Sequence, residues 1–273
     1  MTVEAIRVSP SWLDLREPAD AAARAWELVA LLRHRVPADD TWSIHDLASG
    51  GGAMGRWLAP LLAGPQHWIL QDRDAELQEL AALDVPGPAA DGAEVTVETR
   101  LSDITLLGPD DLAGAALVTA SALLDLLTWD ELSALIHACV GAGCPVLFTL
   151  SVTGRVQLLP ADRLDAQIAA AFDAHQRRPT SRGRLLGPGA VEAAVEAFRR
   201  LGAEVVVRPS AWRLGATESD LAAEWLTGWV DAACEQEPAL APEADLYRRR
   251  RLREAAAGVL AVTVGHADLL VLP

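Results

Sequence analysis

The stretch His45-Asp46-Leu47-Ala48-Ser49-Gly50-Gly51-Gly52 decides the fold of this chain. It closes a β-prone segment over residues 41–47 and opens a segment with apolar residues at helical spacing, which stops at Gly64 and Pro65. A turn rich in glycine lets the backbone approach a ligand without a Cβ clash, and the following helix presents free N–H groups. The order of strand, glycine turn and helix predicts a unit that binds a ligand at the end of its strand.

Strand-like and helix-like segments alternate along the rest of the chain. We predict strands over 67–71, 95–99, 115–120, 145–150, 204–208 and 266–272, and helices over 75–83, 129–140 and 190–201. This alternation is typical of an α/β fold with a Rossmann-like, doubly wound, mostly parallel sheet of seven strands, covered by helices on both faces. Ligands of such sheets bind at the carboxyl ends of the strands.

Three segments lie outside this alternation. Residues 19–36 are rich in Ala with apolar residues at helical spacing, which predicts an N-terminal helix within a segment over 1–40. Residues 151–187 contain a predicted helix from about 162 to 175 and are interpreted as an insertion that leaves the sheet. Residues 212–257 are predicted to form a second helical insertion. With no repeat or low-complexity linker in the chain, we expect one sheet with helical insertions forming a cap.

The composition excludes several classes of protein. The chain has 273 residues, of which 51% are hydrophobic, so it can bury a large core. All 23 basic residues are arginines, which excludes P-loop, Schiff-base, pyridoxal phosphate and Tyr-x-x-x-Lys enzymes because each needs a lysine amine. The net charge of −15 repels phosphate backbones and anionic lipids, so we expect neither nucleic acid nor a membrane as partner.

Cysteine usage and hydropathy indicate the compartment. Cys139, Cys144 and Cys234 have no C-x-x-C spacing, so neither a disulfide framework nor a metal site is expected. No apolar run has the length of a signal peptide or of a bilayer span, and we expect a cytoplasmic protein. Abundant Ala, Leu, Arg and Gly without Lys suggests a GC-rich bacterial genome.

The glycines alone leave two ligand classes open. Gly50, Gly52 and Gly55 match the G-x-G-x-x-G spacing of dinucleotide folds, which keeps a nicotinamide-dependent oxidoreductase as an alternative. Asp46 lies in the strand four residues before Gly50, where a carboxylate can reach an amino-acid ammonium. Asp72 ends the next strand, where it can accept both hydroxyls of an adenosine ribose and would repel a 2′-phosphate. These two acids favour a methyl donor.

The segment over 46–52 resembles motif I of the class I S-adenosylmethionine-dependent methyltransferases, D-x-G-x-G-x-G. Asp46, Gly50 and Gly52 match, whereas Ala48 stands where the family usually has glycine. The resemblance covers about residues 41–150. It implies S-adenosyl-L-methionine as cofactor, S-adenosyl-L-homocysteine as product, an antiparallel last strand and a methyltransferase domain over 41–273.

The resemblance also implies the residues that hold the cofactor. Asp72 matches the acid that binds the ribose, Asp103 and Ile104 resemble the position that contacts the adenine, and residues 119–125 resemble the segment that closes over the cofactor. The expected cofactor-binding residues are therefore Asp46, Ala48, Ser49, Gly50, Gly52, Asp72, Arg73, Asp103, Ile104, Ala120 and Ser121. Asp72 and Asp103 have simpler alternatives as a helix cap and a turn residue.

The methyl acceptor is expected to contact the segments outside the common fold. His175, at the end of the insertion helix, is the first candidate for a general base, although it could instead interact with the helix dipole. Asp125 follows the fourth predicted strand and is the second catalytic candidate. His266, at the start of the last predicted strand, ranks after His175. Arg16 and Arg24 are candidates, by position only, for holding the cofactor carboxylate.

Two further clusters have both a structural and a functional interpretation. Trp225 and Trp229 share one helix face; they pack in the core or, if that face covers the pocket, indicate a flat aromatic acceptor. Arg248–Arg251 bind an anionic substrate or pair with nearby acids on a solvated helix face.

We therefore predict a methyltransferase that acts on an O or N atom of a small polar or aromatic metabolite. A homodimer of this protein is a further prediction. The alternatives are a binding protein without activity on a degenerate methyltransferase fold, and the oxidoreductase named above.

Overall fold

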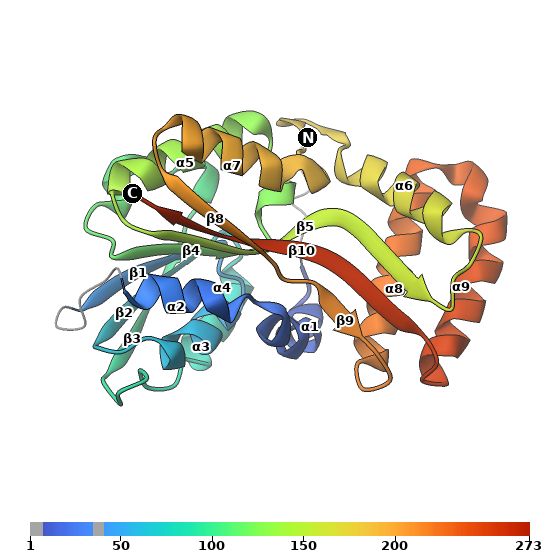
Figure 1. Ribbon diagram of the computed structural model, residues 1–273, viewed down its shortest axis with the longest axis horizontal. Coiled ribbons are helices and arrows are strands. Elements are labelled where there is room, and N and C mark those ends of the chain that lie inside the picture. Colours follow the sequence, from blue (N-terminus) through green and yellow to red (C-terminus); the bar gives the residue numbers. More distant parts are fainter. Residues whose placement is uncertain (1–7, 35–40) are drawn as a thin grey trace.

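A mostly parallel sheet forms the centre of the computed structural model, which describes residues 8–34 and 41–273 (Figure 1). Its strands are β1 (Trp42–Leu47), β2 (Gln66–Asp72), β3 (Val95–Leu101), β4 (Leu117–Ser121), β5 (Val146–Leu159), β8 (Glu204–Pro209), β9 (Trp212–Leu214) and β10 (Ala261–Leu272). A separate two-stranded hairpin pairs β6 (Pro179–Thr180) with β7 (Gly183–Arg184).

The order of the strands is β3-β2-β1-β4-β5-β10-β8, and β9 pairs with the outer half of β10. Strands β1 to β5 are parallel, and β10 runs antiparallel to both β5 and β8. The predicted Rossmann-like sheet with a reversed last strand is confirmed. The short β9 is an eighth strand that the sequence analysis placed in a helical stretch.

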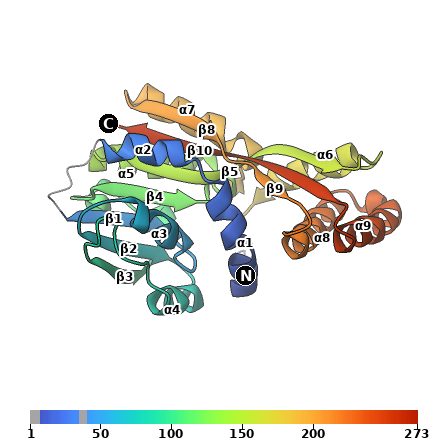
Figure 2. The same cartoon turned by 60° about the horizontal axis from the view of Figure 1, so that its bottom comes forward.

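Helices cover both faces of the sheet. On one face α2 (Trp26–Arg33), α3 (Ala53–Leu58) and α4 (Ala75–Leu83) pack against β1, β2 and β4, whereas α5 (Trp129–Ala142) and α7 (Ala190–Arg200) cover the other face (Figure 1). Figure 2 shows the same layers from a second direction. Each face therefore has its own apolar core, which fixes the strands and holds their carboxyl ends in register.

A third core lies beyond the common sheet, in a region that we call the wing. The wing consists of the outer halves of β5 and β10 with β9, covered by α6 (Asp165–Gln176), α8 (Ser219–Gln236) and α9 (Ala241–Ala256) (Figure 1). The prediction that residues 151–187 leave the sheet is wrong for 151–159, which continue β5. Pairing with β10 satisfies their backbone, and the wing helices bury Leu158 and Val264.

The N-terminal helix differs from its prediction. Two helices, α1 (Pro10–Ala23) and α2, replace the single helix expected over 19–36, and the chain turns between them at Arg24 and Ala25. Residues 35–40 lie outside the described part of the chain. The turn is fixed by tertiary contacts, because the Arg24 side chain is buried and the Ala25 N–H donates to Asp268 Oδ2 at 2.7 Å. Among the described residues, no helix is long and apolar enough to cross a membrane.

Candidate active site

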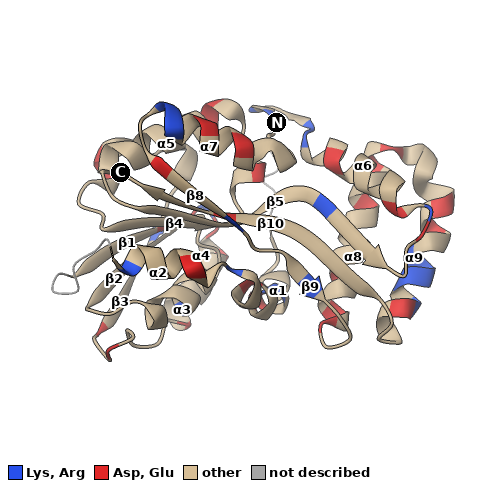
Figure 3. Cartoon of the chain, in the orientation of Figure 1, with Lys and Arg blue, Asp and Glu red and all other residues tan. Residues whose placement is uncertain are grey.

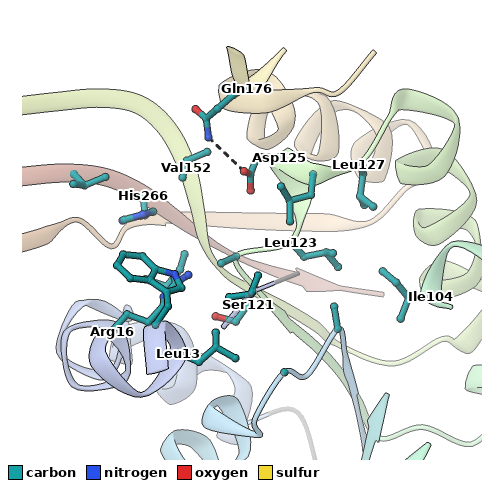
Figure 4. Close-up of a pocket in the computed structure, with 18 of the residues that line it drawn as sticks. Leu13, Arg16, Ile104, Ser121, Leu123, Asp125, Leu127, Val152, Gln176 and His266 are labelled. Atoms are coloured by element: carbon teal, nitrogen blue, oxygen red, sulfur yellow. Dashed lines mark hydrogen bonds between the residues drawn. The ribbon is translucent and has the colours of Figure 1, made fainter. Parts of the chain in front are cut away.

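A cavity of about 560 Å³ opens at the carboxyl ends of β1, β2, β4 and the inner half of β5. Residues of helix α1 and of the wing line it together with the strand ends. Figure 4 shows Arg16 and His266 at one end, Ile104 and Leu127 at the other, and Ser121, Leu123 and Asp125 between them. The volume is that of a site for one or two small molecules.

The glycine turn has the backbone shape that its sequence predicts. Ala48, Gly50 and Gly52 all have positive φ angles, of 52°, 53° and 83°. Ala48 and Gly50 line the cavity, and a Cβ on Gly50 would lie 3.3 Å from Leu13 Cδ1 of α1. Glycine at this position therefore keeps α1 close to the turn. Ala48 adopts the left-handed conformation although it carries a Cβ, which costs about 1–2 kcal/mol.

Asp72 braces this turn and also faces the cavity. Its Oδ2 accepts a hydrogen bond from the backbone N–H of Gly50 and its Oδ1 accepts one from the N–H of Asp74, both at 2.9 Å. The cap of helix α4 is Asp74, which accepts from Glu76 N, and not Asp72. A carboxylate has about four acceptor positions, so Asp72 retains capacity to bind a ligand hydroxyl.

Asp103 and Ile104 line the cavity at the end of β3, beside Arg73. Asp103 also caps a short 3₁₀ turn and accepts from both the backbone N–H and the hydroxyl of Thr105, at 3.0 and 2.7 Å. Burial opposes ionisation of this carboxyl, but the bonds from Thr105 outweigh it and the pKa is lowered. Asp103 is therefore ionised and fixed, as an acceptor for an amine should be.

Two buried groups of opposite charge lie behind the cavity wall. Asp46 Oδ1 accepts from Thr119 Oγ1 at 2.7 Å, while its Oδ2 has no hydrogen-bond partner within residues 8–34 and 41–273. Burial raises the pKa of Asp46 to about 7, against the opposing effects of Thr119 and Arg24. Arg24 stacks its guanidinium over the Trp57 ring at 5.1 Å, and its Nη1 has no partner. Both groups thus have an unused hydrogen-bonding atom.

Ser121 connects this buried pair to the cavity, which it lines. Its Oγ lies 3.2 Å from Arg24 Nη2 and 3.1 Å from Thr149 Oγ1, and both of these groups donate to it. Since Ser121 accepts twice from the protein, its own hydroxyl hydrogen is available to a ligand. The positive charge of Arg24 strengthens that donor toward an anion.

Four of the expected cofactor residues lie beside the cavity without lining it: the buried Asp46 described above, Ser49, Gly52 and Ala120. Ser49 Oγ accepts from Gln78 Nε2 at 3.1 Å, Gly52 faces Leu70 and Ala81 of the core, and Ala120 is buried within β4. They shape the turn and the sheet beneath the site.

Asp125 lies at the centre of the cavity, on the 3₁₀ turn Leu124–Leu126 that follows β4. Burial raises its pKa to about 6, and in the described structure its hydrogen-bond contact from another side chain is Gln176 Nε2, 3.5 Å from Oδ2 (Figure 4). Gln176 Oε1 is buried without a partner. Asp125 is therefore a weakly solvated base with a pKa just below neutrality.

His175 does not line the cavity. Its Nε2 lies 3.2 Å from Glu235 Oε2 of α8, and its Nδ1 lies 3.2 Å from Arg178 Nη1. Burial and then Arg178 lower its pKa. The next residue, Gln176, lines the cavity, because adjacent helix positions point about 100° apart. The predicted catalytic role of His175 stays a prediction that the lining of the cavity does not support.

His266 lies in the middle of β10, opposite Val152 of β5, and not at the start of that strand as expected. Its ring lines the cavity and meets the Trp212 ring edge-on, with centroids 5.2 Å apart. Burial and then the charge of Arg16 lower its pKa to about 3, so the imidazole is neutral. Its Nδ1 has no hydrogen-bond partner.

The other clusters take mainly structural roles. Trp229 is buried in the core, whereas Trp225 stacks on it at 5.1 Å and also lines the cavity; the flat aromatic acceptor stays a prediction. The arginines over 248–251 pair with carboxylates of α6, α8 and α9 and with Asp162 in the loop before α6. Figure 3 shows this basic cluster on α9, surrounded by acidic positions. They hold the wing together away from the cavity.

No protein-family model and no curated protein matches the chain. A methyltransferase from Thiobacillus denitrificans, solved with S-adenosyl-L-homocysteine, is 14% identical, with 98% of this chain and 100% of that chain covered and a TM-score of 0.46.

Two other solved structures show similarity of the same order. The cyclopropane synthase MmaA2 from Mycobacterium tuberculosis is 12% identical, with 90% of this chain and 82% of that chain covered and a TM-score of 0.45. The YcgJ protein from Bacillus subtilis is 11% identical, with 90% and 97% covered and a TM-score of 0.47. The antiparallel β10 is the reversed last strand that the resemblance of residues 41–150 implied.

Proposed function

We propose that this protein transfers a methyl group from S-adenosyl-L-methionine to an O or N atom of a small molecule. The observation that carries the proposal is the pair of unpartnered atoms, Asp46 Oδ2 and Arg24 Nη1, beside a glycine turn that lines the cavity. Leaving a buried charged group without a hydrogen bond costs several kcal/mol unless a ligand or water satisfies it. Neither residue lines the cavity itself; Arg24 acts on it through its hydrogen bond to Ser121, which can bind the carboxylate of a zwitterionic amino acid.

The other expected residues fit the remaining parts of the cofactor. Ser121 offers a hydroxyl hydrogen to the carboxylate, Asp72 offers free acceptor positions to the ribose, and Asp103 with Ile104 offers an acceptor and an apolar surface to the adenine. All of them lie along the strand ends of one cavity. The chain can therefore hold the cofactor in an extended form.

When bound, the cofactor supplies a methyl group on a positively charged sulfur. The chain's own task is to align the acceptor atom with that carbon and to remove a proton from it. Asp125 is placed for the second task, since it lines the cavity beyond Ser121 and its pKa of about 6 leaves it mostly ionised at neutral pH. Gln176 orients it through the contact to Oδ2.

Calorimetric titration of the purified protein with S-adenosyl-L-homocysteine and, in parallel, with NADH tests this proposal. We expect micromolar binding of the first and none of the second. The opposite result would favour the oxidoreductase. Binding of S-adenosyl-L-homocysteine, without methyl transfer to any acceptor, would favour the alternative of a binding protein without activity.

A further inference from the structure

The cavity has a second end that the cofactor residues do not reach. We call it the aromatic chamber and define it by Trp12 of α1, Phe172 of α6, Trp212 of β9, Trp225 of α8 and His266 of β10. All five rings line the cavity; His266 lies on β10 of the sheet, and the other four come from α1 and the wing (Figure 1). Most of this end is therefore built by elements outside the common sheet.

The rings of the chamber are held in place by neighbours. Trp12 meets Trp212 edge-on with centroids 6.3 Å apart, and Trp212 donates its indole N–H to Asp20 Oδ1 at 2.9 Å. Trp225 is stacked on the buried Trp229. These contacts satisfy the indole N–H of Trp212 and cover one face of Trp225. The surfaces that Trp212 and Trp225 present to the cavity are therefore apolar ring carbons. Preordered aromatic surfaces favour a flat aromatic ligand, with offset stacking or edge contacts.

Aromatic chambers also bind cations, but the charges around this one oppose that. The Arg16 guanidinium, which is paired with Asp20 at 2.9 Å, lies over the Trp212 ring, 5.1 Å from its centroid, and so occupies the face that a ligand cation would use. Arg155 lines the cavity as well, against the acids Asp125 and Asp173, whereas Arg182 is paired with Glu131. The sulfonium of the cofactor would add a further positive charge. A protonated amine therefore lacks the open Trp212 face that it would need, and a neutral or weakly acidic ring is the better ligand.

We propose that the acceptor is a flat aromatic ring bearing a hydroxyl, methylated on that oxygen and not on an amine. This inference rests on the proposed function and assigns the substrate class of the same site. The ring lies among the chamber residues and its hydroxyl faces Asp125. Gln176 Oε1, buried and unpartnered on the same wall, accepts a second polar hydrogen where the ring carries one.

The transfer step balances without any further reactant. The hydroxyl oxygen forms a bond to the methyl carbon, the bond between that carbon and sulfur breaks, and its electron pair stays on sulfur. The hydroxyl proton passes to the Asp125 carboxylate and then to water.

Binding to the protein saturated with S-adenosyl-L-homocysteine tests the inference without requiring turnover. We would titrate 2-naphthol, 2-naphthylmethylamine and cyclohexanol and follow tryptophan fluorescence and calorimetry. We expect 2-naphthol to bind at least about tenfold more tightly than the other two probes, and mass spectrometry to detect 2-methoxynaphthalene with the methyl donor present. Tighter binding of the amine, or equal binding of cyclohexanol, would overturn the inference.

Two variants test whether 2-naphthol binds in the aromatic chamber. Trp225→Ala should weaken 2-naphthol binding at least about tenfold and leave the affinity for S-adenosyl-L-homocysteine unchanged. Trp26→Ala, on an indole that is 68% exposed and outside the cavity, is the matched control and should change neither. Unchanged binding of 2-naphthol by Trp225→Ala would refute the chamber as its site.

Arg16→Met separates the charge argument from the packing argument. It should bring the affinities for 2-naphthol and 2-naphthylmethylamine closer together, and an unchanged ratio would refute the role of Arg16. If S-adenosyl-L-homocysteine itself does not bind to the wild-type protein, the proposed function fails. If it binds and 2-naphthol does not, only the substrate class fails. Trp225→Phe replaces Trp225→Ala if the latter loses cofactor binding.

Discussion

Asp72 is joined to the glycine turn itself, since its Oδ2 accepts a hydrogen bond from the backbone N–H of Gly50 at 2.9 Å. The second oxygen accepts from the N–H of Asp74 at the start of the next helix. One carboxylate therefore links the ends of β1 and β2 and fixes the turn before any ligand arrives. The residue expected to bind the ribose is thus also part of the scaffold.

Asp72→Ala should lower both cofactor affinity and stability. Two hydrogen bonds to a charged acceptor are lost, and we expect a decrease of about 2 kcal/mol in the free energy of unfolding. The affinity for S-adenosyl-L-homocysteine should fall about 10- to 100-fold, as expected for two ribose hydroxyls. Urea unfolding and calorimetry measure the two quantities. A variant with normal affinity would remove Asp72 from the site.

The pH dependence of turnover should report Asp125. This carboxyl must be ionised to accept a proton, and burial raises its pKa to about 6, so kcat should rise with pH through about 6 and level off near 7. Asp125→Asn should lower kcat about 10²- to 10⁴-fold and remove this acidic limb. Asp173→Asn changes another acid of the cavity and is the control, which should keep the acidic limb of the kcat profile. A wild-type profile that is flat between pH 5 and 8 would contradict the role.

Gln176 and His175 make a direct comparison, because one lines the cavity and its neighbour does not. Gln176→Ala removes the donor to Asp125 Oδ2 and should move the acidic limb of kcat to higher pH. His175→Ala should leave kcat within about twofold and the pH profile unchanged. Loss of activity in His175→Ala, with cofactor binding intact, would instead support the role first predicted for this histidine.

Asp46 should make the ligand-free protein less stable as the pH rises. Burial raises its pKa from the ordinary 3.8 to about 7, so the folded state binds this proton more tightly than the unfolded chain does. Its contribution to stability is therefore lost between about pH 4 and pH 7. Asp46→Asn should raise the free energy of unfolding at pH 8 by at least about 1 kcal/mol and weaken cofactor binding.

Thermal unfolding at pH 5 and pH 8 measures this effect. The gain of Asp46→Asn over the wild type should be larger at pH 8, where the wild-type carboxyl is ionised. Equal gains at both values would show that Asp46 is not the titrating group.

Ala48→Gly should stabilise the protein slightly. The left-handed conformation costs alanine about 1–2 kcal/mol, while glycine costs about 0.5–1 kcal/mol more backbone entropy on folding, so a net gain of about 0.5 kcal/mol is expected. The midpoint of urea unfolding measures it. Ala53→Gly, at the first residue of α3, is the matched control and should destabilise.

Several parts of the fold could be predicted because the signal is local. The helix expected over 75–83 has the bounds observed for α4, and β1, β2, β3 and β4 agree within two residues at each end. The wing could not be predicted. Residues 151–159 are strand because β10, more than 100 positions away in the chain, pairs with them. The break at Arg24 likewise depends on Thr149, Ser121 and Asp268.

The sequence by itself determined the glycine turn, the acids at the strand ends and hence the cofactor end of the cavity, because each lies a fixed number of residues from its own strand. Only the tertiary structure decided the acceptor end. It turned His175 away and Gln176 inward, and it placed Trp12, Trp212, Trp225 and His266 together from four distant segments. The reason is physical: backbone shape at a turn follows from neighbouring residues, whereas a chamber between elements depends on how those elements pack.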